Sequence, residues 1–435
     1  MKRVAVIGGG PKAAALCAKA HCINAFGGQI QLRVFEKDAW GAAWAGRYGY
    51  TDGEQRLCTP AERDVGFPYG EGLLHGEGVR LLFREFSWSA FLVEAAGRPE
   101  GYRNWVDRGR KPPAHSVYAA YLAWVIEKAR VKRTLGEVTA VGRQDDKWTI
   151  TYRQRGQSRT ADNFDGVVFT GPGPAIEGFP RPVDPRIIDG VGFWRNPEAF
   201  LSQAEDGEEP VVIAGSGGTS AAIAAWIARR GRSGPILIIG NQAALFTRTE
   251  SFFENALFSD EEAWSALDPQ VRVSVTQRLT RGVVWASVSE ILSASPDVRF
   301  RPGRVRSAVN QPGVDGAPAE LRVNVEDATG TRADPARLVI DAAGFNAWWF
   351  ADLLPPAVRE ATLPAAAAPK PKAVREHRDA MAAAIRTDLS LDLGVEGLHA
   401  PMLALAQGPG FASLMVLGSM SERILRAYAT PLAPL

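Results

Sequence analysis

The residues of this chain with the clearest chemical pattern form a glycine-rich turn near the N-terminus. Gly8, Gly10 and Ala13 fit the pattern G-x-G-x-x-A directly after the apolar run Val4–Ile7. The first small residue allows a sharp turn, the second lets the backbone approach a pyrophosphate, and the third lets the next helix pack on the strand. The helix then points its free N–H groups at the phosphates. The turn therefore predicts a phosphate site.

Pro11 and Lys12 begin the alanine-rich helix that follows, and we assign both to the same cofactor site. Glu36 comes directly after the apolar run Ile30–Phe35 and lies 36 − 8 = 28 residues after Gly8, somewhat beyond the usual spacing. An acid at the end of this second strand accepts hydrogen bonds from an adenosine ribose. Together these residues predict a dinucleotide site, with FAD as the favoured ligand.

A second unit of the same kind begins at the apolar run Val211–Ala214. Gly215, Gly217 and Ser220 fit G-x-G-x-x-S at the head of a helix rich in alanine and isoleucine, and Thr219 lies in the same turn. The pattern predicts a second nucleotide site. Two such units in one chain imply that a hydride leaves a nicotinamide in one site and reaches a flavin in the other.

The strand after this second turn, Ile236–Ile239, ends without an acid. A neutral residue with arginines nearby tolerates a 2′-phosphate, so NADPH is favoured over NADH. The arginines available are Arg229, Arg230, Arg232 and Arg248, and a solvated basic face is the alternative for most of them.

Length and composition fit a globular protein of two domains. The chain has 435 residues, a formal net charge of +2 and 46% hydrophobic residues. Such a charge gives no reason to expect nucleic acid or an anionic membrane as a partner. No apolar run is long and unbroken enough to predict a membrane span, so the cytoplasm is the expected location.

Three cysteines and five scattered histidines predict neither a disulfide framework nor a metal site. Cys17 and Cys22 have the spacing of flavin disulfide reductases, but both fall on the first predicted helix. Five residues turn a helix by about 500°, so the two thiols point roughly 140° apart and cannot bridge. Without a redox pair, the expected electron acceptor of a reduced flavin is dioxygen or a bound substrate.

Periodicity and turn residues predict further elements in the first half of the chain. They are a helix over 118–130, a hairpin of 136–141 with 148–152, a buried strand that runs into a tight turn over 166–173, and a loop over 105–113.

Short segments in a defined order run almost from end to end of the chain. They are DVGFPY (64–69), WVDRGR (105–110), YLAWV (121–125), TGPG (170–173), LFTR (245–248), FFEN (252–255), LFSD (257–260), RGV (281–283) and QGPGF (407–411). By these segments the chain resembles the flavin-dependent N-hydroxylating monooxygenases. The resemblance is greatest to the mycobactin- and nocobactin-type lysine N6-monooxygenases.

The resemblance implies a class B flavin monooxygenase architecture, an α/β fold with two Rossmann-like dinucleotide-binding domains. The expected FAD-binding domain covers 1–176 and the NADPH-binding domain covers 177–334. Residues 335–435 return to the FAD domain and supply a helix of the substrate site. The resemblance also implies that NADPH reduces FAD, that O2 is captured as a C4a-hydroperoxide, and that a dimer or tetramer forms.

The resemblance further implies cofactor contacts outside the two glycine-rich turns. In this sequence they fall on Trp44, Cys58, Arg248, Gly344 and Phe411.

The implied substrate residues partly depart from the family pattern. The family's lysine that contacts the amino-acid carboxylate falls on Arg63, and the asparagine of the F-x-N segment is Asn255. A second asparagine or aspartate is Thr280 here, and a serine of the C-terminal helix is Met415. The alternatives are an ion pair with a neighbouring acid for Arg63 and a helix cap for Asn255.

The expected activity is FAD- and NADPH-dependent N-hydroxylation of a side-chain amine, with N6 of L-lysine favoured, on a route to a hydroxamate siderophore. Ornithine, a diamine or another amino acid are alternative substrates. A reductase that passes electrons to a protein partner and a non-catalytic nucleotide-binding protein are alternatives of other classes.

Overall fold

Two five-stranded sheets organise the chain, and in both of them neighbouring strands run parallel. The computed structural model describes residues 1–94, 101–203, 208–231, 234–248, 251–280, 283–311, 320–366 and 368–429. Parallel strands require crossover connections, which are mostly helices. The architecture confirms the predicted α/β fold with two Rossmann-like units.

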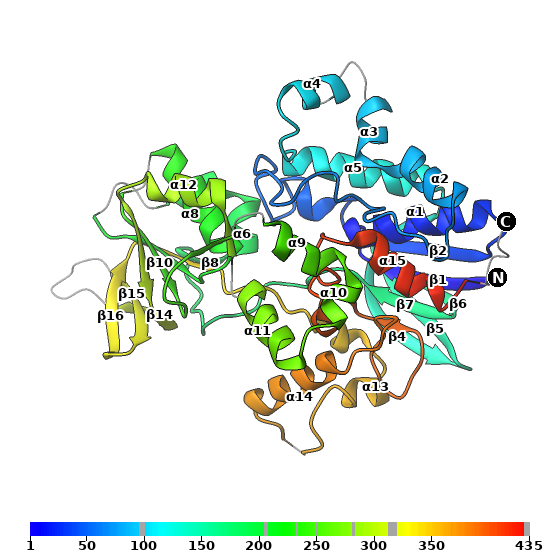
Figure 1. The fold of residues 1–435 in the computed structure, drawn as a ribbon. Helices are drawn as coiled ribbons and strands as arrows, with labels where there is room; N and C mark the ends of the chain where they lie inside the picture. The colour runs from blue at the N-terminus through cyan, green and yellow to red at the C-terminus, as the bar shows by residue number, and fades with distance from the viewer. Residues whose placement is uncertain are drawn as a thin grey trace.

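The first sheet lies on the right of Figure 1 and has the strand order β18-β7-β1-β2-β3. Its strands are β1 (Lys2–Ile7), β2 (Ile30–Glu36), β3 (Lys132–Leu135), β7 (Gly166–Phe169) and β18 (Leu398–His399). Helix α1 (Pro11–Ala25) follows β1 and packs beside α5 (His115–Lys128). Most of α1 is buried, because its alanines let neighbouring elements approach closely.

Other elements of the first unit cover this sheet or flank it. They are η1 (Ala42–Trp44), α2 (Glu77–Phe86), α3 (Trp88–Glu94), α4 (Tyr102–Asp107), the antiparallel strands β4 (Glu137–Gln144), β5 (Lys147–Gln154) and β6 (Gln157–Phe164), and the C-terminal η3 (Trp349–Leu353), α13 (Pro356–Glu360), α14 (Pro371–Ala383), η4 (Pro401–Gln407) and α15 (Leu417–Arg426). The antiparallel pairing of β4 with β5 confirms the predicted hairpin.

The second sheet, on the left of Figure 1, has the order β13-β10-β9-β17-β8. Its elements are β8 (Ile187–Asp189), α6 (Gly190–Arg195), α7 (Pro197–Leu201), β9 (Val211–Ala214), α8 (Gly218–Arg230), β10 (Ile236–Gly240), α12 (Ala286–Ser293), β13 (Val298–Pro302) and β17 (Leu338–Asp341). Beside them lie the parallel pair β11 (Phe246–Arg248) and β12 (Val283–Trp285) and the antiparallel strands β14 (Arg304–Gln311), β15 (Glu320–Asp327) and β16 (Gly330–Ala336).

Strand β17 shifts the expected boundary between the two units. It pairs with β8 and β9, so its residues belong to the second sheet. The chain therefore crosses back to the first unit after Asp341, later than the expected start of the return segment at residue 335.

Three helices lie between the two sheets in Figure 1. They are α9 (Phe252–Ser259), α10 (Glu261–Ser265) and α11 (Pro269–Thr280). Helix α10 lies beside α15. The segment between β11 and β12 of the second unit therefore contacts the C-terminal helix of the first unit.

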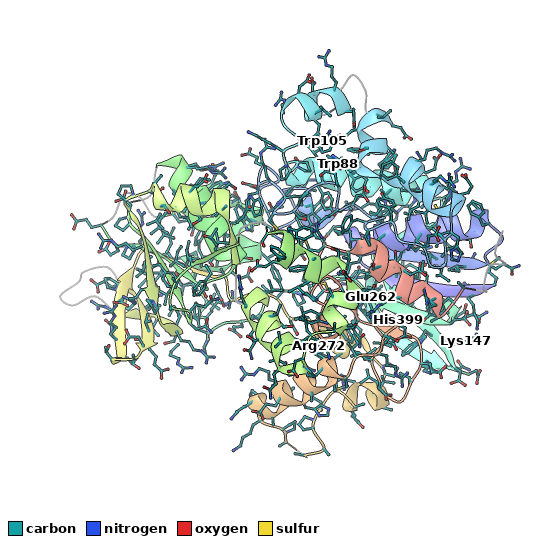
Figure 2. All side chains as sticks on the ribbon, viewed as in Figure 1. Trp88, Trp105, Lys147, Glu262, Arg272 and His399 are labelled. Carbon is teal, nitrogen blue, oxygen red and sulfur yellow. The ribbon has the colours of Figure 1, made fainter. Side chains whose placement is uncertain are left out.

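The expected loop over 105–113 is wrong at its start, because α4 includes Trp105. Figure 2 shows Trp105 beside Trp88, and their ring centroids are 6.5 Å apart. The indole N–H of Trp105 also donates to the carbonyl of Lys111 at 3.1 Å. Aromatic packing between α3 and α4 thus orders a segment whose local composition favours a turn.

Within the described ranges, no helix combines the length and apolar character that crossing a membrane requires.

Candidate functional site

The first glycine-rich turn has a backbone that only glycine fits at its first position. Gly8 has φ +103°, and a Cβ there would lie 2.5 Å from the hydroxyl oxygen of Thr170. That hydroxyl donates to the carbonyl of Ile7 at 2.9 Å, which fixes it in place. The turn is therefore held tightly between β1 and β7.

Gly10 leaves open space where a side chain would otherwise be. A Cβ at this position meets no atom within 4 Å. Gly10 is the N-cap of α1 and supplies no side-chain hydrogen bond, so N–H groups of the first turn of α1 are available to a ligand. Open space in front of a helix N-terminus fits a pyrophosphate. Ala13, fully buried, lets α1 pack closely, as predicted.

Glu36 lies against the same turn. One carboxylate oxygen accepts the N–H of Gly9 at 2.6 Å, and the other accepts the N–H of Asp38 at 3.0 Å. Burial raises the pKa of Glu36, while these backbone donors favour its charged form. A carboxylate held in this way still has lone pairs for a ribose hydroxyl. Its contact with the cofactor stays a prediction.

Lys12 has a role that the sequence did not reveal. Its ammonium donates to the carbonyls of Phe411 at 2.6 Å and Ser413 at 2.9 Å. Burial lowers the pKa of Lys12 to about 7, whereas the two carbonyls favour the charged form. The side chain thus fastens the QGPGF segment to the head of α1, from a distance of 399 residues along the chain.

The second turn repeats the geometry of the first. Gly215 has φ +137°, and a Cβ there would lie 2.4 Å from the carbonyl oxygen of Ala342. Gly217 caps α8 without a side-chain hydrogen bond, and a Cβ on it meets nothing within 4 Å. The buried hydroxyl of Ser220 donates to the carbonyl of Gly217 at 2.8 Å. Thr219 turns its methyl group toward Gly190. This turn also fits a pyrophosphate.

Two of the four arginines considered for a 2′-phosphate have other partners. Arg229 lies 3.6 Å from the carboxylate of Asp52. Arg230 stacks on Trp226 at 3.5 Å and pairs with Glu198 at 2.9 Å. Both residues stand at the C-terminal end of α8, about 18 Å from the glycine-rich turn at its head. They hold the second unit together and fasten it to the first.

Arg248 and Arg232 are the other two arginines considered for a 2′-phosphate. Arg248 ends β11, eight residues after the end of β10 (248 − 240 = 8), and its side chain lies outside the described part. Arg232 also lies outside the described residues. Arg248 therefore stays a prediction.

The remaining expected cofactor residues come from three different segments. The ring of Trp44 makes edge contacts with His115 at 4.8 Å and Tyr118 at 5.3 Å. Cys58 is exposed. Gly344 has φ +113° with open space at its Cβ position, and its carbonyl accepts the N–H of Ile176 at 3.0 Å. Gly344 thus lies at the crossing between the units.

The structure brings two of the expected substrate residues together. Arg63 donates to the carbonyl of Met415 at 3.3 Å, and its guanidinium lies 4.8 Å from the ring centroid of Phe67. The sulfur of Met415 lies 3.3 Å from the hydroxyl of Thr59. Thr280 is the last residue of α11, and its side chain lies outside the described part.

Asn255 occupies the interior of α9, so it does not cap a helix. The cap position of α9 is Ser251, and α10 is capped by the carboxylate of Asp260. The carbonyl of Phe258 lies only 2.4 Å from where a Cβ of Gly410 would stand. Helix α9 therefore packs directly on the QGPGF segment, near Phe411.

Asp64 was not expected as a site residue, yet it shapes the loop that carries Arg63. One of its oxygens accepts the N–H of Gly66 at 3.0 Å and the hydroxyl of Tyr69 at 2.7 Å. The other accepts the N–H of Trp88 at 2.8 Å. Burial raises the pKa of Asp64 to about 6, against these donors. The DVGFPY segment, which begins with Asp64, could have drawn attention to this residue, but no sequence pattern indicates its partner Trp88, 24 residues further along.

Cys17 and Cys22 are both free and buried, which confirms that they do not bridge. Burial raises the pKa of Cys22 to about 12 and also raises that of Cys17. Thiols kept protonated in this way are poor redox nucleophiles.

Comparisons with known proteins agree with this geometry. No family model matches the chain. It is 33% identical over 432 residues to L-lysine N6-monooxygenase MbtG of Mycobacterium tuberculosis, covering 98% of this chain and 94% of the relative. It is 36% identical over 433 residues to the protein of the same name from Mycobacterium sp. strain MCS, covering 98% and 94%.

Solved structures show the same likeness. Lysine monooxygenase NbtG of Nocardia farcinica superposes with a TM-score of 0.77 and 31% identity, covering 98% of this chain and all of the other. Ornithine N-hydroxylase KtzI of Kutzneria sp. 744 superposes with a TM-score of 0.70 over 98% of both chains. At 15% identity, the second likeness concerns the fold alone.

The chain shares more than 30% identity with these lysine monooxygenases over nearly its whole length. It also has two dinucleotide-binding turns, and Cys17 and Cys22 beside the first turn form no disulfide. The chain accordingly belongs to the L-lysine N6-monooxygenase family of flavin-dependent N-hydroxylating enzymes.

Proposed function

We propose that this enzyme uses FAD, NADPH and O2 to hydroxylate the side-chain amine of a free amino acid, with L-lysine as the favoured substrate and N6-hydroxy-L-lysine as the product. The observation that carries the proposal is the position of the segment 411–415. It is bonded to Lys12 at the first dinucleotide turn and to Arg63 at its other end. A guanidinium that can bind a carboxylate thus stands close to the flavin turn.

The residues that would hold the flavin fit it. Gly10 leaves space that fits a pyrophosphate, the head of α1 has N–H donors, and the carboxylate of Glu36, held beside Gly9, would accept hydrogen bonds from the ribose. When bound, the reduced flavin supplies the activation of O2 and the transfer of one oxygen atom to the amine. The protein must bind the substrate, orient it and exclude water.

Arg63 is the proposed anchor of the substrate carboxylate. A guanidinium binds a carboxylate with two parallel hydrogen bonds, which sets the direction in which the rest of the substrate extends. The far amine of lysine has a pKa of about 10.4, so only about one molecule in 2,500 is neutral near pH 7. A site with little water would favour that neutral, nucleophilic form.

Relatives favour lysine as the substrate, since the curated relatives and NbtG are named as lysine monooxygenases. Steady-state NADPH oxidation combined with a hydroxylamine assay across lysine, ornithine, cadaverine and putrescine tests the proposal. Lysine should give the highest kcat/KM and one hydroxylamine per NADPH. NADPH oxidation without hydroxylamine for every amine would overturn it.

The second turn gives a separate prediction about the nicotinamide. Gly217→Val puts a branched side chain into the space for the NADPH pyrophosphate, at an extended backbone position (φ −99°) that valine adopts. Reduction of bound FAD at low NADPH should slow by about tenfold or more, with FAD content unchanged. Stopped-flow reduction by NADPH measures this, with dithionite reduction as the control. NADPH should also reduce the wild-type flavin faster than NADH. Unchanged reduction of the variant would contradict this assignment of the turn.

The proposal also includes a cytoplasmic location and a homo-oligomer, dimeric or tetrameric, as the family resemblance implies. Size-exclusion chromatography with light scattering tests the oligomer.

A further inference from the structure

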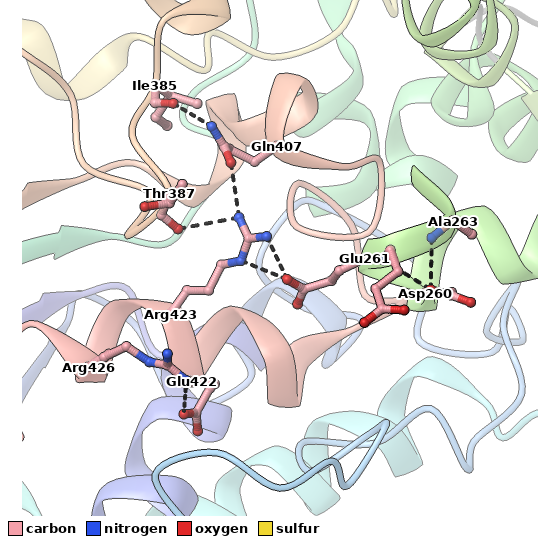
Figure 3. Close-up of polar contacts among 10 residues, drawn as sticks. Asp260, Glu261, Ala263, Ile385, Thr387, Gln407, Glu422, Arg423 and Arg426 are labelled. Carbon is pink, nitrogen blue, oxygen red and sulfur yellow. Dashed lines mark hydrogen bonds and ion pairs between the residues drawn. The ribbon is translucent and has the colours of Figure 1, made fainter. Parts of the chain in front are cut away.

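Arg423, on α15, is bonded to three other segments of the chain (Figure 3). Its Nε and Nη2 donate to one carboxylate oxygen of Glu261, at 3.1 and 2.6 Å. Its Nη1 donates to the side-chain oxygen of Gln407 at 3.0 Å and to the carbonyl of Thr387 at 3.3 Å. Gln407 in turn donates to the carbonyl of Ile385 at 2.7 Å. Both ends of the guanidinium are thus engaged.

The same guanidinium lies over the ring of Phe411, 4.3 Å from its centroid. The Arg423 side chain is only 20% exposed, which strengthens a cation–π contact. Gln407 and Phe411 are the first and last residues of the QGPGF segment. Arg423 therefore holds both ends of the segment that Lys12 fastens to the flavin turn.

On the other side, Glu261 belongs to the helix pair α9–α10. Asp260 caps α10, and the preceding helix, α9, carries Asn255. Trp264 is 3% exposed and stands beside Gly408. The carbonyl of Phe258 lies against Gly410. These apolar and backbone contacts bring the helix pair and the segment together. The two hydrogen bonds from the Arg423 guanidinium to Glu261, called the Arg423 fork below, are directional and therefore also fix how the helix pair is oriented.

We propose that Arg423 is a positioning residue for the substrate site. It sets the placement of the α9–α10 pair, with Asn255, relative to the segment 407–415, with Phe411 and Met415. The inference rests on the proposed function in one respect, since it assumes that Asn255 and Phe411 serve substrate and flavin. Arg423 itself touches neither and acts through these residues.

The test compares Arg423→Met with Arg426→Met. Methionine keeps an apolar stem over Phe411 but removes the charge and the fork. Arg426 lies on the same helix, is 67% exposed and pairs with Glu422 at 3.1 Å, which makes it a matched control. Arg423→Met should raise KM for L-lysine about tenfold and lower the hydroxylamine formed per NADPH. NADPH reduction of the flavin without amine should not change. Arg423→Lys, which keeps the charge without the fork, should restore part of the loss.

A second measurement does not depend on the substrate. Amide hydrogen exchange over 252–265 should accelerate in Arg423→Met and in Glu261→Ala, and not in Arg426→Met. Glu261→Ala removes the oxygen that accepts both Arg423 hydrogen bonds, and it serves if Arg423→Met does not fold. Adding Glu261→Ala to Arg423→Met should change KM little further, because these hydrogen bonds are already lost.

The possible outcomes separate the two ideas. Unchanged exchange, KM and coupling in both variants, with only a lower melting temperature, would overturn the positioning role. If the wild type hydroxylates no amine but the Arg423 variant still shows faster exchange over 252–265, the proposed function is refuted, and the role of Arg423 in placing the α9–α10 pair stands.

Discussion

Replacing Gly10 with valine should yield a folded protein that binds FAD about a hundredfold more weakly, a loss of about 2.7 kcal/mol. The backbone at Gly10 is extended, with φ −92° and ψ −163°, a region that β-branched residues favour. A Cβ meets no protein atom within 4 Å, so the fold has room for the side chain. The same room is where the pyrophosphate approaches the backbone. The substitution should therefore act on the ligand and spare the fold.

The measurement is the flavin absorbance per purified chain, followed by titration of the apoprotein with FAD. Gly70→Val is the matched control, since Gly70 also has open space at its Cβ position and lies outside the turn. Gly10→Ala should fall between the two. A Gly10→Val protein that keeps stoichiometric FAD would remove the basis for the first dinucleotide site.

The two dinucleotide units were predictable because their signals are local. A buried strand, a glycine-rich turn and an alanine-rich helix follow one another within about twenty residues, and each element's conformation depends on its own composition. The structure confirms β1 with α1 and β9 with α8. Gly8 and Gly215 both have a positive φ, and in both turns the residue that follows a neighbouring strand, Thr170 after β7 and Ala342 after β17, lies too close for a Cβ.

What the sequence could not supply are contacts between distant segments. Lys12 lies next to the glycine-rich turn in the sequence, which suggests a contact with the phosphates. Its ammonium instead donates to the carbonyls of Phe411 and Ser413, which lie about 400 residues further along the chain. Arg229 is one of the arginines considered for a 2′-phosphate, but it lies near the C-terminal end of α8, away from the glycine-rich turn, and pairs with Asp52. In the same way, Trp105 of α4 packs beside Trp88, a contact that local composition, which favours a loop from residue 105, does not reveal.

Loss of the Arg63 side chain is expected to have the largest effect on the substrate. A charged hydrogen bond contributes roughly 1.5–3 kcal/mol, so Arg63→Ala should raise KM for L-lysine by about one to two orders of magnitude. Reduction of the flavin by NADPH requires no amino acid in this proposal and should continue. The variant should therefore consume NADPH and O2 but release hydrogen peroxide in place of the hydroxylamine. Product formed per NADPH at saturating lysine, in wild type and variant, measures this directly.

Two further variants separate anchoring from packing. Arg63→Lys keeps the charge and restores the residue type of the resembled family, so KM and coupling should stay within a few-fold of wild type. Arg80→Ala removes an equally charged side chain from α2, where it is 72% exposed and pairs with Glu77, and should leave both unchanged.

Arg63 also stacks on Phe67 and bonds to Met415, so its loss loosens the loop as well as the anchor. A loosened loop alone would affect lysine and a diamine such as cadaverine equally, because neither effect would involve a carboxylate. A missing anchor should raise KM for lysine and leave cadaverine, which has no carboxylate, unaffected. Equal losses for the two amines would therefore show that Arg63 supports the loop and that the carboxylate is bound elsewhere.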